Sequence, residues 1–293
     1  PTISGLHKDM NLVEVTDIGA LSSFFKGKIG HRRAAFFMRI LTIDRLNRTY
    51  DRSSGYSGTE FSGRFLNDIG VKYVVGNAER LKQLPDGAFI TVSNHPYGGL
   101  DGLMLIDLIA RLRPDFRVMV NKALSMVKTL RDNFISVTSK DNENESVAMA
   151  SMRGIRETVS HLRNGHPVGF FPSGAISDFS AREMRIRDRH WQEGVIHLIH
   201  SAKVPVLPIR FFDGNSPFFY FLGLLNWRVR LLRLPYEVFN KRGRHPRIGI
   251  GNIISVEKQE RFGNPEALGE FLRKSVYEMP LPAFPEEKLQ SQN

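Results

Sequence analysis

A histidine and an aspartate, His95 and Asp101, lie in a short glycine-rich segment, residues 93–102. The apolar run before it, residues 88–92, is typical of a buried strand, and the apolar residues after it, 103–111, favour a helix. α/β enzymes often place their chemistry in such turns, and a histidine held by a carboxylate can act as a general base toward an alcohol. From position alone, the segment equally fits a structural turn whose backbone is set by Pro96 and the glycines.

Strands and helices alternate along most of the chain. The apolar patterns predict strands at residues 71–75, 88–92, 116–120, 134–137, 167–171, 204–212 and 247–254, and helices at 60–69, 103–111, 147–164 and 194–201. We therefore expect an α/β fold with a mixed, largely parallel central sheet flanked by helices, and an N-terminal helical region. In such a sheet, the loops that follow residues 92, 171 and 212 would converge on one crevice.

Four short motifs follow one another along the chain. The first pairs Asn94 and His95 with Asp101, and the second places Lys122 before the strand expected at 134–137. The third reads Phe-Pro-Ser-Gly-Ala-Ile-Ser over residues 171–177, and an aromatic-x-x-Gly element follows at 191–194. The fourth is the proline-containing apolar strand at 204–209. In this order the motifs resemble the glycerolphosphate acyltransferase-like family, the lysophospholipid acyltransferases, over roughly residues 70–260.

The first departure from the family pattern lies in the spacing of the His-Asp motif. Five residues separate His95 from Asp101 where the family has four, and the pair Gly98 and Gly99 can absorb the extra residue. This form of the motif is similar to a bacterial hemolysin-like branch that includes O-acyltransferases of amino-acid lipids such as ornithine and glycine lipids.

The second departure lies in the third motif. Family members that acylate glycerol phosphates have Glu and Arg where this chain has Ser173 and Ile176, and those side chains help to hold the acceptor and its phosphate. Because neither replacement can form a bidentate phosphate contact, glycerol 3-phosphate and lysophosphatidate are disfavoured as acceptors. Arg182 and three neighbouring arginines are candidates for supplying positive charge, although a solvated basic loop explains any one of them more simply.

The resemblance implies a direct acyl transfer. His95 would take the proton from the acceptor as it attacks an acyl thioester, and Asp101 would fix the imidazole tautomer. The thioester of acyl carrier protein or coenzyme A is the expected co-substrate, with no cofactor and no metal. Lys122 is a candidate for the phosphate of the donor's carrier arm or an ordinary surface lysine, and glycine N–H groups are candidates for the oxyanion. The expected substrate-binding residues are Asn94, Gly98, Gly99, Lys122, Phe171, Pro172, Ser173, Gly174 and Arg182.

The chain carries a formal charge of +11, and much of the excess lies between residues 182 and 247. An aromatic and aliphatic run, residues 218–227, is interleaved with these arginines. The combination favours an interfacial contact with an anionic membrane surface over a core helix with a basic rim. A nucleic-acid partner is not expected, because no recognition motif for nucleic acid is present. The chain has no cysteine, which excludes disulfides and thiol nucleophiles.

We divide the chain into an N-terminal helical region (1–68), an acyltransferase domain (69–280) and a polar tail (281–293). Helix is expected over residues 9–48, with membrane contact and core packing equally open, and a linker over 50–58. We expect neither a signal peptide nor a transmembrane helix. The sequence therefore predicts a peripheral membrane O-acyltransferase at the cytoplasmic face of a bacterial inner membrane. Its expected acceptor is a lyso-ornithine or lyso-glycine lipid, with a lysophospholipid or lysophosphatidate second and a non-catalytic lipid-binding role third.

Overall fold

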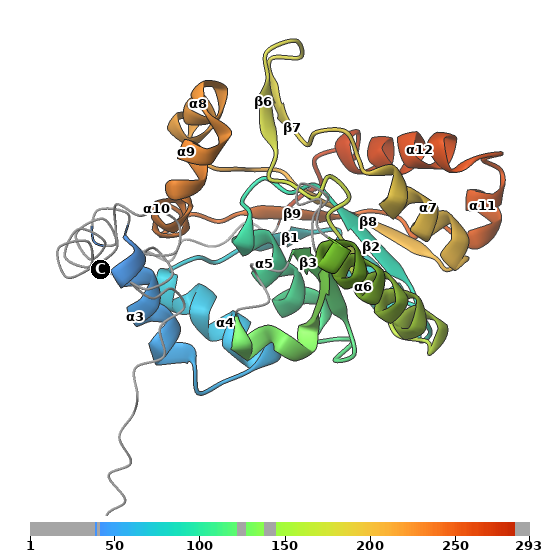
Figure 1. Ribbon diagram of the computed structural model, residues 1–293, viewed down its shortest axis with the longest axis horizontal. Coiled ribbons are helices and arrows are strands. Elements are labelled where there is room, and N and C mark those ends of the chain that lie inside the picture. Colours follow the sequence, from blue (N-terminus) through green and yellow to red (C-terminus); the bar gives the residue numbers. More distant parts are fainter. Residues whose placement is uncertain (1–38, 40–41, 122–126, 138–144, 285–293) are drawn as a thin grey trace, which may run out of the picture.

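A seven-stranded sheet lies at the centre of the computed structural model, which describes residue 39 and residues 42–121, 127–137 and 145–284 (Figure 1). The strand order is β1-β9-β8-β2-β5-β3-β4. Five of the six neighbouring pairs are parallel, and β8 and β9 are antiparallel. The bounds are β1 Val74–Gly76, β2 Ile90–Ser93, β3 Arg117–Asn121, β4 Phe134–Val137, β5 Val168–Phe170, β8 Val206–Phe211 and β9 Arg247–Ile250. The predicted mixed, largely parallel sheet is confirmed.

Helices cover both faces of this sheet. One face packs against α3 (Ile43–Ser53), α4 (Gly58–Ile69) and α5 (Gly99–Ile109), and the other against α6 (Glu145–Arg163), α7 (Glu193–Ala202) and α12 (Pro265–Tyr277) (Figure 1). Successive side chains of a strand point to opposite faces, so each central strand feeds both cores. In β8, Leu207 and Ile209 join the α4–α5 core, while Val206 joins the α7–α12 core.

The first described helix, α3, extends into the stretch for which a linker was predicted. Residues 1–38, where most of the helix over 9–48 was expected, lie outside the described residues. Helix α3 then continues through Ser53, so only the second half of the predicted linker is non-helical. The reason is packing: Tyr50 is buried and its ring meets Phe61 edge to face at 5.5 Å. The aromatic contact within the core thus outweighs the local preference of these residues for a turn.

Two insertions follow the carboxyl ends of parallel strands. An antiparallel hairpin, β6 (Asp178–Ser180) with β7 (Arg185–Arg187), comes after β5. Three short helices, α8 (Pro217–Leu225), α9 (Trp227–Leu232) and α10 (Leu234–Phe239), come after β8. Figure 1 shows the hairpin and the α8–α9 pair standing out from the body on the same side. The smaller elements are η2 (Ala78–Gln83), η4 (Lys128–Asn133) and α11 (Val256–Glu260).

No helix of the described ranges combines the length and the apolar composition that a bilayer crossing requires.

Near the C-terminus, residues 281–284 pack onto the body, where Phe284 meets Phe212 edge to face at 6.0 Å. Residues 285–293 lie outside the described ranges.

Candidate active site

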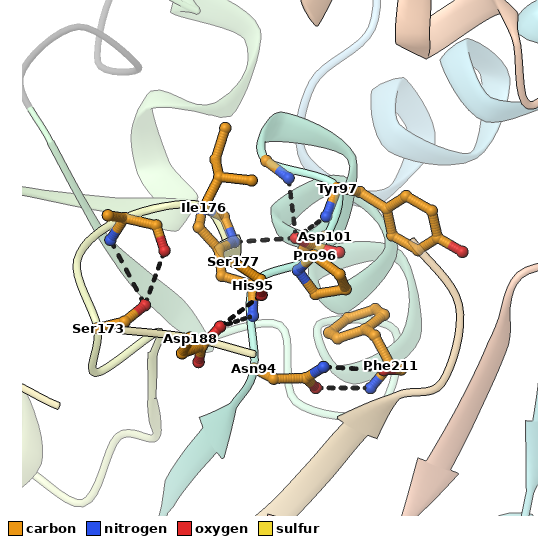
Figure 2. A network of polar contacts seen from close by, with 12 residues as sticks. Asn94, His95, Pro96, Tyr97, Asp101, Ser173, Ile176, Ser177, Asp188 and Phe211 are labelled. Atoms are coloured by element: carbon orange, nitrogen blue, oxygen red, sulfur yellow. Dashed lines mark hydrogen bonds and ion pairs between the residues drawn. The ribbon is translucent and has the colours of Figure 1, made fainter. Parts of the chain in front are cut away.

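The loops after β2, β5 and β8 meet at one edge of the sheet, as the strand pattern predicts. His95 follows β2, and its ring packs against the ring of Phe171, which follows β5, with the centroids 4.3 Å apart. The Asn94 side chain bridges to β8: its Nδ2 donates to the Phe211 carbonyl and its Oδ1 accepts from the Phe211 N–H, both at 2.8 Å (Figure 2). Asn94 therefore fixes the turn to the neighbouring strand with both ends of its amide.

His95 and Asp101 face each other across the start of α5. His95 Nδ1 lies 2.9 Å from Asp101 Oδ2, and the Asp101 side chain is fully buried (Figure 2). The same oxygen accepts the backbone N–H groups of Tyr97 at 2.9 Å and Gly98 at 3.0 Å. Gly98 adopts a φ of 83°, which an L-residue rarely does, and this lets the longer turn close. The five-residue spacing thus preserves the His-Asp contact.

Burial shapes the electrostatics of Asp101. Removal from water raises the pKa of this carboxyl, while the contact with His95 and the two backbone N–H groups act in the opposite direction. A carboxylate beside Nδ1 favours the tautomer with the proton on that nitrogen. Nε2 is then the unprotonated nitrogen, so the pair is suited to take a proton from a hydroxyl group.

A second buried carboxylate, Asp188, holds the backbone of the turn that carries His95. Its Oδ1 accepts the His95 N–H at 3.1 Å and the Ser177 hydroxyl at 2.6 Å. The Ser177 N–H in turn donates to the His95 carbonyl at 2.9 Å (Figure 2). Trp191 donates its indole N–H to Asp188 Oδ2 at 3.3 Å. Asp188 and Ser177 therefore fix both peptide groups of His95.

Sequence reasoning missed Asp188 as a site residue. Burial raises the pKa of its carboxyl, against the hydrogen bonds of Ser177 and of the His95 backbone. It stands 93 residues from His95, and no motif spacing joins the two. The signal that was present is a lone acidic residue between Arg187 and Arg189, three positions before the tryptophan of the aromatic-x-x-Gly element.

The third-motif loop packs directly on the catalytic turn. Ser173, at the position of the family's glutamate, turns its hydroxyl back to the Ala175 carbonyl at 2.8 Å. Ile176, at the position of the arginine, is buried, and its Cδ1 would lie 2.9 Å from a Cβ placed on Gly98. An isoleucine thus fills the space beside the histidine turn with an apolar side chain.

An apolar cavity of about 290 Å³ opens beside His95. Its walls come from α3, α4, the start of α5, β3, η4 and α10. The lining includes the apolar side chains of Leu46, Tyr50, Phe61, Phe65, Leu103, Val120, Leu130, Phe134, Leu234 and Val238. The described lining contains no lysine or arginine. The apolar lining of the cavity therefore suits a chain of apolar atoms whose end lies beside His95.

The predicted substrate-binding residues divide into three groups. Gly98, Gly99, Phe171 and Gly174 line the cavity. Asn94, Pro172, Ser173 and Arg182 do not: the first three support the loops, and Arg182 lies in the turn between β6 and β7. Lys122 lies outside the described residues. Of the glycine N–H groups considered for an oxyanion, Gly98 donates to Asp101 and Gly174 to the Phe171 carbonyl, which leaves Gly99.

Comparison with known families assigns the chain to a class of enzyme. A family model described as "Acyltransferase" matches residues 31–281. The chain belongs to this acyltransferase family, which confirms the resemblance seen in the ordered motifs.

Two curated relatives cover most of the chain. They are lyso-glycine lipid O-acyltransferases from Bacteroides thetaiotaomicron and Phocaeicola vulgatus, each 23% identical over 252 residues. The match spans 84% of this chain and 89% and 86% of the respective relatives. Among solved structures, the 1-acyl-sn-glycerophosphate acyltransferase PlsC from Thermotoga maritima aligns with a TM-score of 0.48 at 14% identity, covering 89% of this chain and 90% of PlsC.

Proposed function

We propose that the protein is a lyso-lipid O-acyltransferase in which His95 is the general base. The observation that carries this proposal is the pair His95 and Asp101 at the edge of an apolar cavity, in a chain of the acyltransferase family. The substrate would be a fatty acyl thioester, with its chain in the cavity and its carbonyl beside the imidazole.

The reaction needs one proton to move twice. His95 Nε2 takes the proton of the acceptor hydroxyl while the hydroxyl oxygen attacks the thioester carbonyl carbon. The C–S bond of the tetrahedral intermediate then breaks, and the leaving thiolate takes the proton from the imidazolium. Asp101 stabilises the imidazolium and keeps Nδ1 protonated throughout. The products are an ester and a free thiol, and no covalent acyl-enzyme is formed.

The first turn of α5 is the best candidate to stabilise the oxyanion. Gly99 is the first residue of this helix and lines the cavity. Its N–H has no hydrogen-bond partner in the described structure, and helix N-termini carry a partial positive charge. A carbonyl oxygen placed against this N–H would gain stabilisation as it becomes negative.

The third-motif loop favours an acceptor without a phosphate beside His95. Ile176 and Ser173 replace the residues that hold a glycerol phosphate in the family, and the described cavity lining has no cation. Two curated relatives are named for lyso-glycine lipid. We therefore place a lyso-glycine or lyso-ornithine lipid first, as in the hemolysin-like branch. A lysophospholipid or lysophosphatidate is second, with Arg182 in the β6–β7 turn as a candidate contact for a phosphate.

The donor and the location complete the proposal. Either acyl carrier protein or coenzyme A can present the thioester, with Lys122 as a candidate contact for the phosphate of the carrier arm. The enzyme would work as a peripheral protein on the anionic cytoplasmic face of a bacterial inner membrane, where lyso-lipids reside. The segment of residues 1–68 is proposed to contribute to this membrane association.

The test is acyl transfer by the purified protein with labelled acyl carrier protein and acyl-coenzyme A. The acceptors would be lyso-glycine lipid, lyso-ornithine lipid, lysophosphatidate and lysophosphatidylethanolamine, all in detergent micelles. Ester formation on an amino-acid lipid, at a higher kcat/KM than on either phospholipid, supports the proposal. Preference for lysophosphatidate would move the assignment to the second candidate. Binding of the lipids without ester formation from either donor would leave only the non-catalytic role.

A further inference from the structure

The exposed apolar side chains of this protein are concentrated on the two insertions. Ten of the fifteen large apolar side chains that are exposed in the described residues lie between positions 184 and 236. The most exposed are Met184 (76%), in the turn before β7, and Leu225 (68%), at the end of α8. On α8 the exposed Phe218, Phe221, Leu224 and Leu225 recur at helical spacing, and α9 adds the exposed Trp227, Val229 and Leu232.

The hairpin and the helix pair present these side chains together. Both stand out from the body on the same side (Figure 1). Met184 and Ile186 from the hairpin share an apolar surface groove with Phe221 and Leu224 from α8. Surface apolar residues on a monomeric protein are usually scattered, so a gathered set of this kind marks an interaction surface.

Arginines lie beside this surface. The segments 178–187 and 217–237 contain six arginines and three acidic residues, a net charge of +3. Arg230 is buried against Asp178, and Arg187 and Arg233 pair with Glu183 and Glu237. Arg185 on the hairpin is exposed, and the guanidinium of Arg233 lies 4.6 Å and 4.2 Å from the ring centres of Phe218 and Tyr236. Aromatic and aliphatic side chains rimmed by arginine match the interface of an anionic bilayer, where the rings enter the headgroup region and the cations meet lipid phosphates.

The same elements are attached rigidly to the catalytic turn. Arg230 of α9 is buried, forms an ion pair with Asp178, and donates to the Ile176 and Ser177 carbonyls at 3.2 Å each. Gly223 of α8 makes room for it, because a Cβ there would lie 2.8 Å from Arg230 Cδ. The surface is thus joined to the loop that holds the His95 backbone.

The surface also leads to the cavity. α10 directly follows α9, and its residues Leu234 and Pro235 line the cavity next to Gly98 and Gly174. Leu234 also packs against the small core that α8 shares with Ile176. An acyl chain leaving a bilayer beside α9 would therefore meet apolar atoms from the surface to His95.

We propose that the β6–β7 turn and the α8–α9 pair form one docking face for an anionic phospholipid bilayer, which places the cavity entrance at the membrane surface. This inference rests on the proposed function, because the docking face has a purpose only if the substrates are membrane lipids. It assigns a membrane contact to named elements of the described structure, in addition to the contribution proposed for the segment 1–68.

The test is flotation of the full chain with phosphatidylethanolamine vesicles, with and without phosphatidylglycerol. The double variant Leu225→Glu with Trp227→Glu places two charges at the turn between α8 and α9. We expect its vesicle-bound fraction, and its kcat/KM on vesicle-embedded acceptor, to fall about tenfold or more, with kcat/KM in detergent micelles unchanged. The matched control is Leu112→Glu with Leu281→Glu, which charges two equally exposed leucines elsewhere and should bind like wild type.

Two further readouts make the result specific. The chain has two tryptophans, and Trp191 is buried, so vesicle binding should shift the emission of wild type to the blue but not that of Trp227→Phe. Arg185→Glu should weaken binding only to vesicles that contain phosphatidylglycerol.

Two results would overturn the docking face. One is flotation of the double variant at the wild-type level, and the other is a dimer in solution that the same substitutions dissociate while vesicles remain unbound. Absence of acyl transfer in micelles by wild type would instead defeat the proposed function, and flotation would still report on docking.

Discussion

The backbone N–H of His95 donates a hydrogen bond to Asp188 Oδ1 at 3.1 Å, and the Ser177 hydroxyl donates to the same oxygen. His95, the proposed general base, is therefore positioned by two carboxylates, Asp101 on its ring and Asp188 on its main chain. Burial raises the pKa of the Asp188 carboxyl, and the hydrogen bonds that it accepts act in the opposite direction.

Asp188→Asn tests whether Asp188 acts on the activity of the folded enzyme or only on its stability. The amide oxygen can accept only part of the present bonds, and the amide N–H groups would oppose the Trp191 N–H, so the His95 backbone should shift. We expect kcat to fall about ten- to hundredfold with little change in KM. A purely structural role would instead lower the amount of folded enzyme, with the activity per folded molecule unchanged.

The pH dependence of unfolding gives a second readout for the same variant. Burial raises the pKa of Asp188 in the folded state, so the folded protein holds its proton more tightly than the unfolded chain. The stability contributed by the protonated form is complete below the unfolded pKa and is lost as pH rises through the folded pKa. Urea unfolding should therefore show the unfolding free energy of Asp188→Asn rising relative to that of wild type from pH 4 to pH 7. A constant difference in unfolding free energy between the two proteins across this range would contradict a raised pKa for the Asp188 carboxyl.

Gly98→Ala should damage the catalytic turn. The residue has a φ of 83°, and the new Cβ would lie 2.9 Å from Ile176 Cδ1. We expect a loss of about 1–3 kcal/mol in unfolding free energy, together with reduced kcat. The control is Gly102→Ala, one helical turn later, where a Cβ meets nothing within 4 Å and alanine favours the helix. Thermal unfolding of the two variants side by side checks the difference, and equal stability would argue against the strained turn.

Glu237 should make the cavity wall sensitive to acid. It lies in α10 and binds the buried ammonium of Lys241 at 2.8 Å. Burial would raise the pKa of Glu237, but hydrogen bonds from Lys241 and Ser216 outweigh it and hold the pKa at about 2, below the ordinary 4.5. This stabilisation is present above pH 4.5 and is lost as pH falls toward 2.

Glu237→Gln tests this ion pair. It leaves Lys241 buried without its partner, and we expect a loss of about 3–5 kcal/mol at neutral pH. Urea unfolding between neutral and acid pH should show that the unfolding free energy of wild type approaches that of Glu237→Gln as the pH falls. An unchanged gap between the two proteins would mean that the pair does not stabilise α10.

Leu46→Trp should alter the choice of acyl chain. Leu46 of α3 lines the apolar cavity, and the larger ring would occupy part of its volume. We expect kcat/KM for long acyl thioesters to fall about tenfold more than for short ones. Leu112→Trp, outside the cavity, serves as the control and should leave the chain-length profile unchanged. A uniform loss across all chain lengths would show that the cavity does not hold the acyl chain.

Much of this structure is predictable from the sequence where the signal is local. The strands around His95, the helix that begins with Asp101 in its first turn, and the convergence of three loops follow from apolar runs and a short motif. The turn-rich residues after Tyr50 mislead, because their local preference for turns is overruled by packing on Phe61.

Other features depend on contacts between distant residues. Asp188 reaches His95 only after the chain has formed five more strands, and a single acidic residue among arginines is typical of a solvated loop. The role of Arg230 is hidden in the same way, because its partners lie more than fifty residues away. Composition located the basic and aromatic region, but the joining of β6–β7 with α8–α9 into one surface required the three-dimensional fold.

The central claim is that His95 performs the transfer, and the most direct measurement is acyl transfer by His95→Ala beside wild type. Both would use the same acyl thioester and lyso-glycine lipid in micelles, with thermal unfolding confirming that both are folded. We expect kcat of the variant to fall by about 10²–10⁴ while the acceptor still binds. A folded His95→Ala enzyme that forms ester at the wild-type rate would contradict that claim.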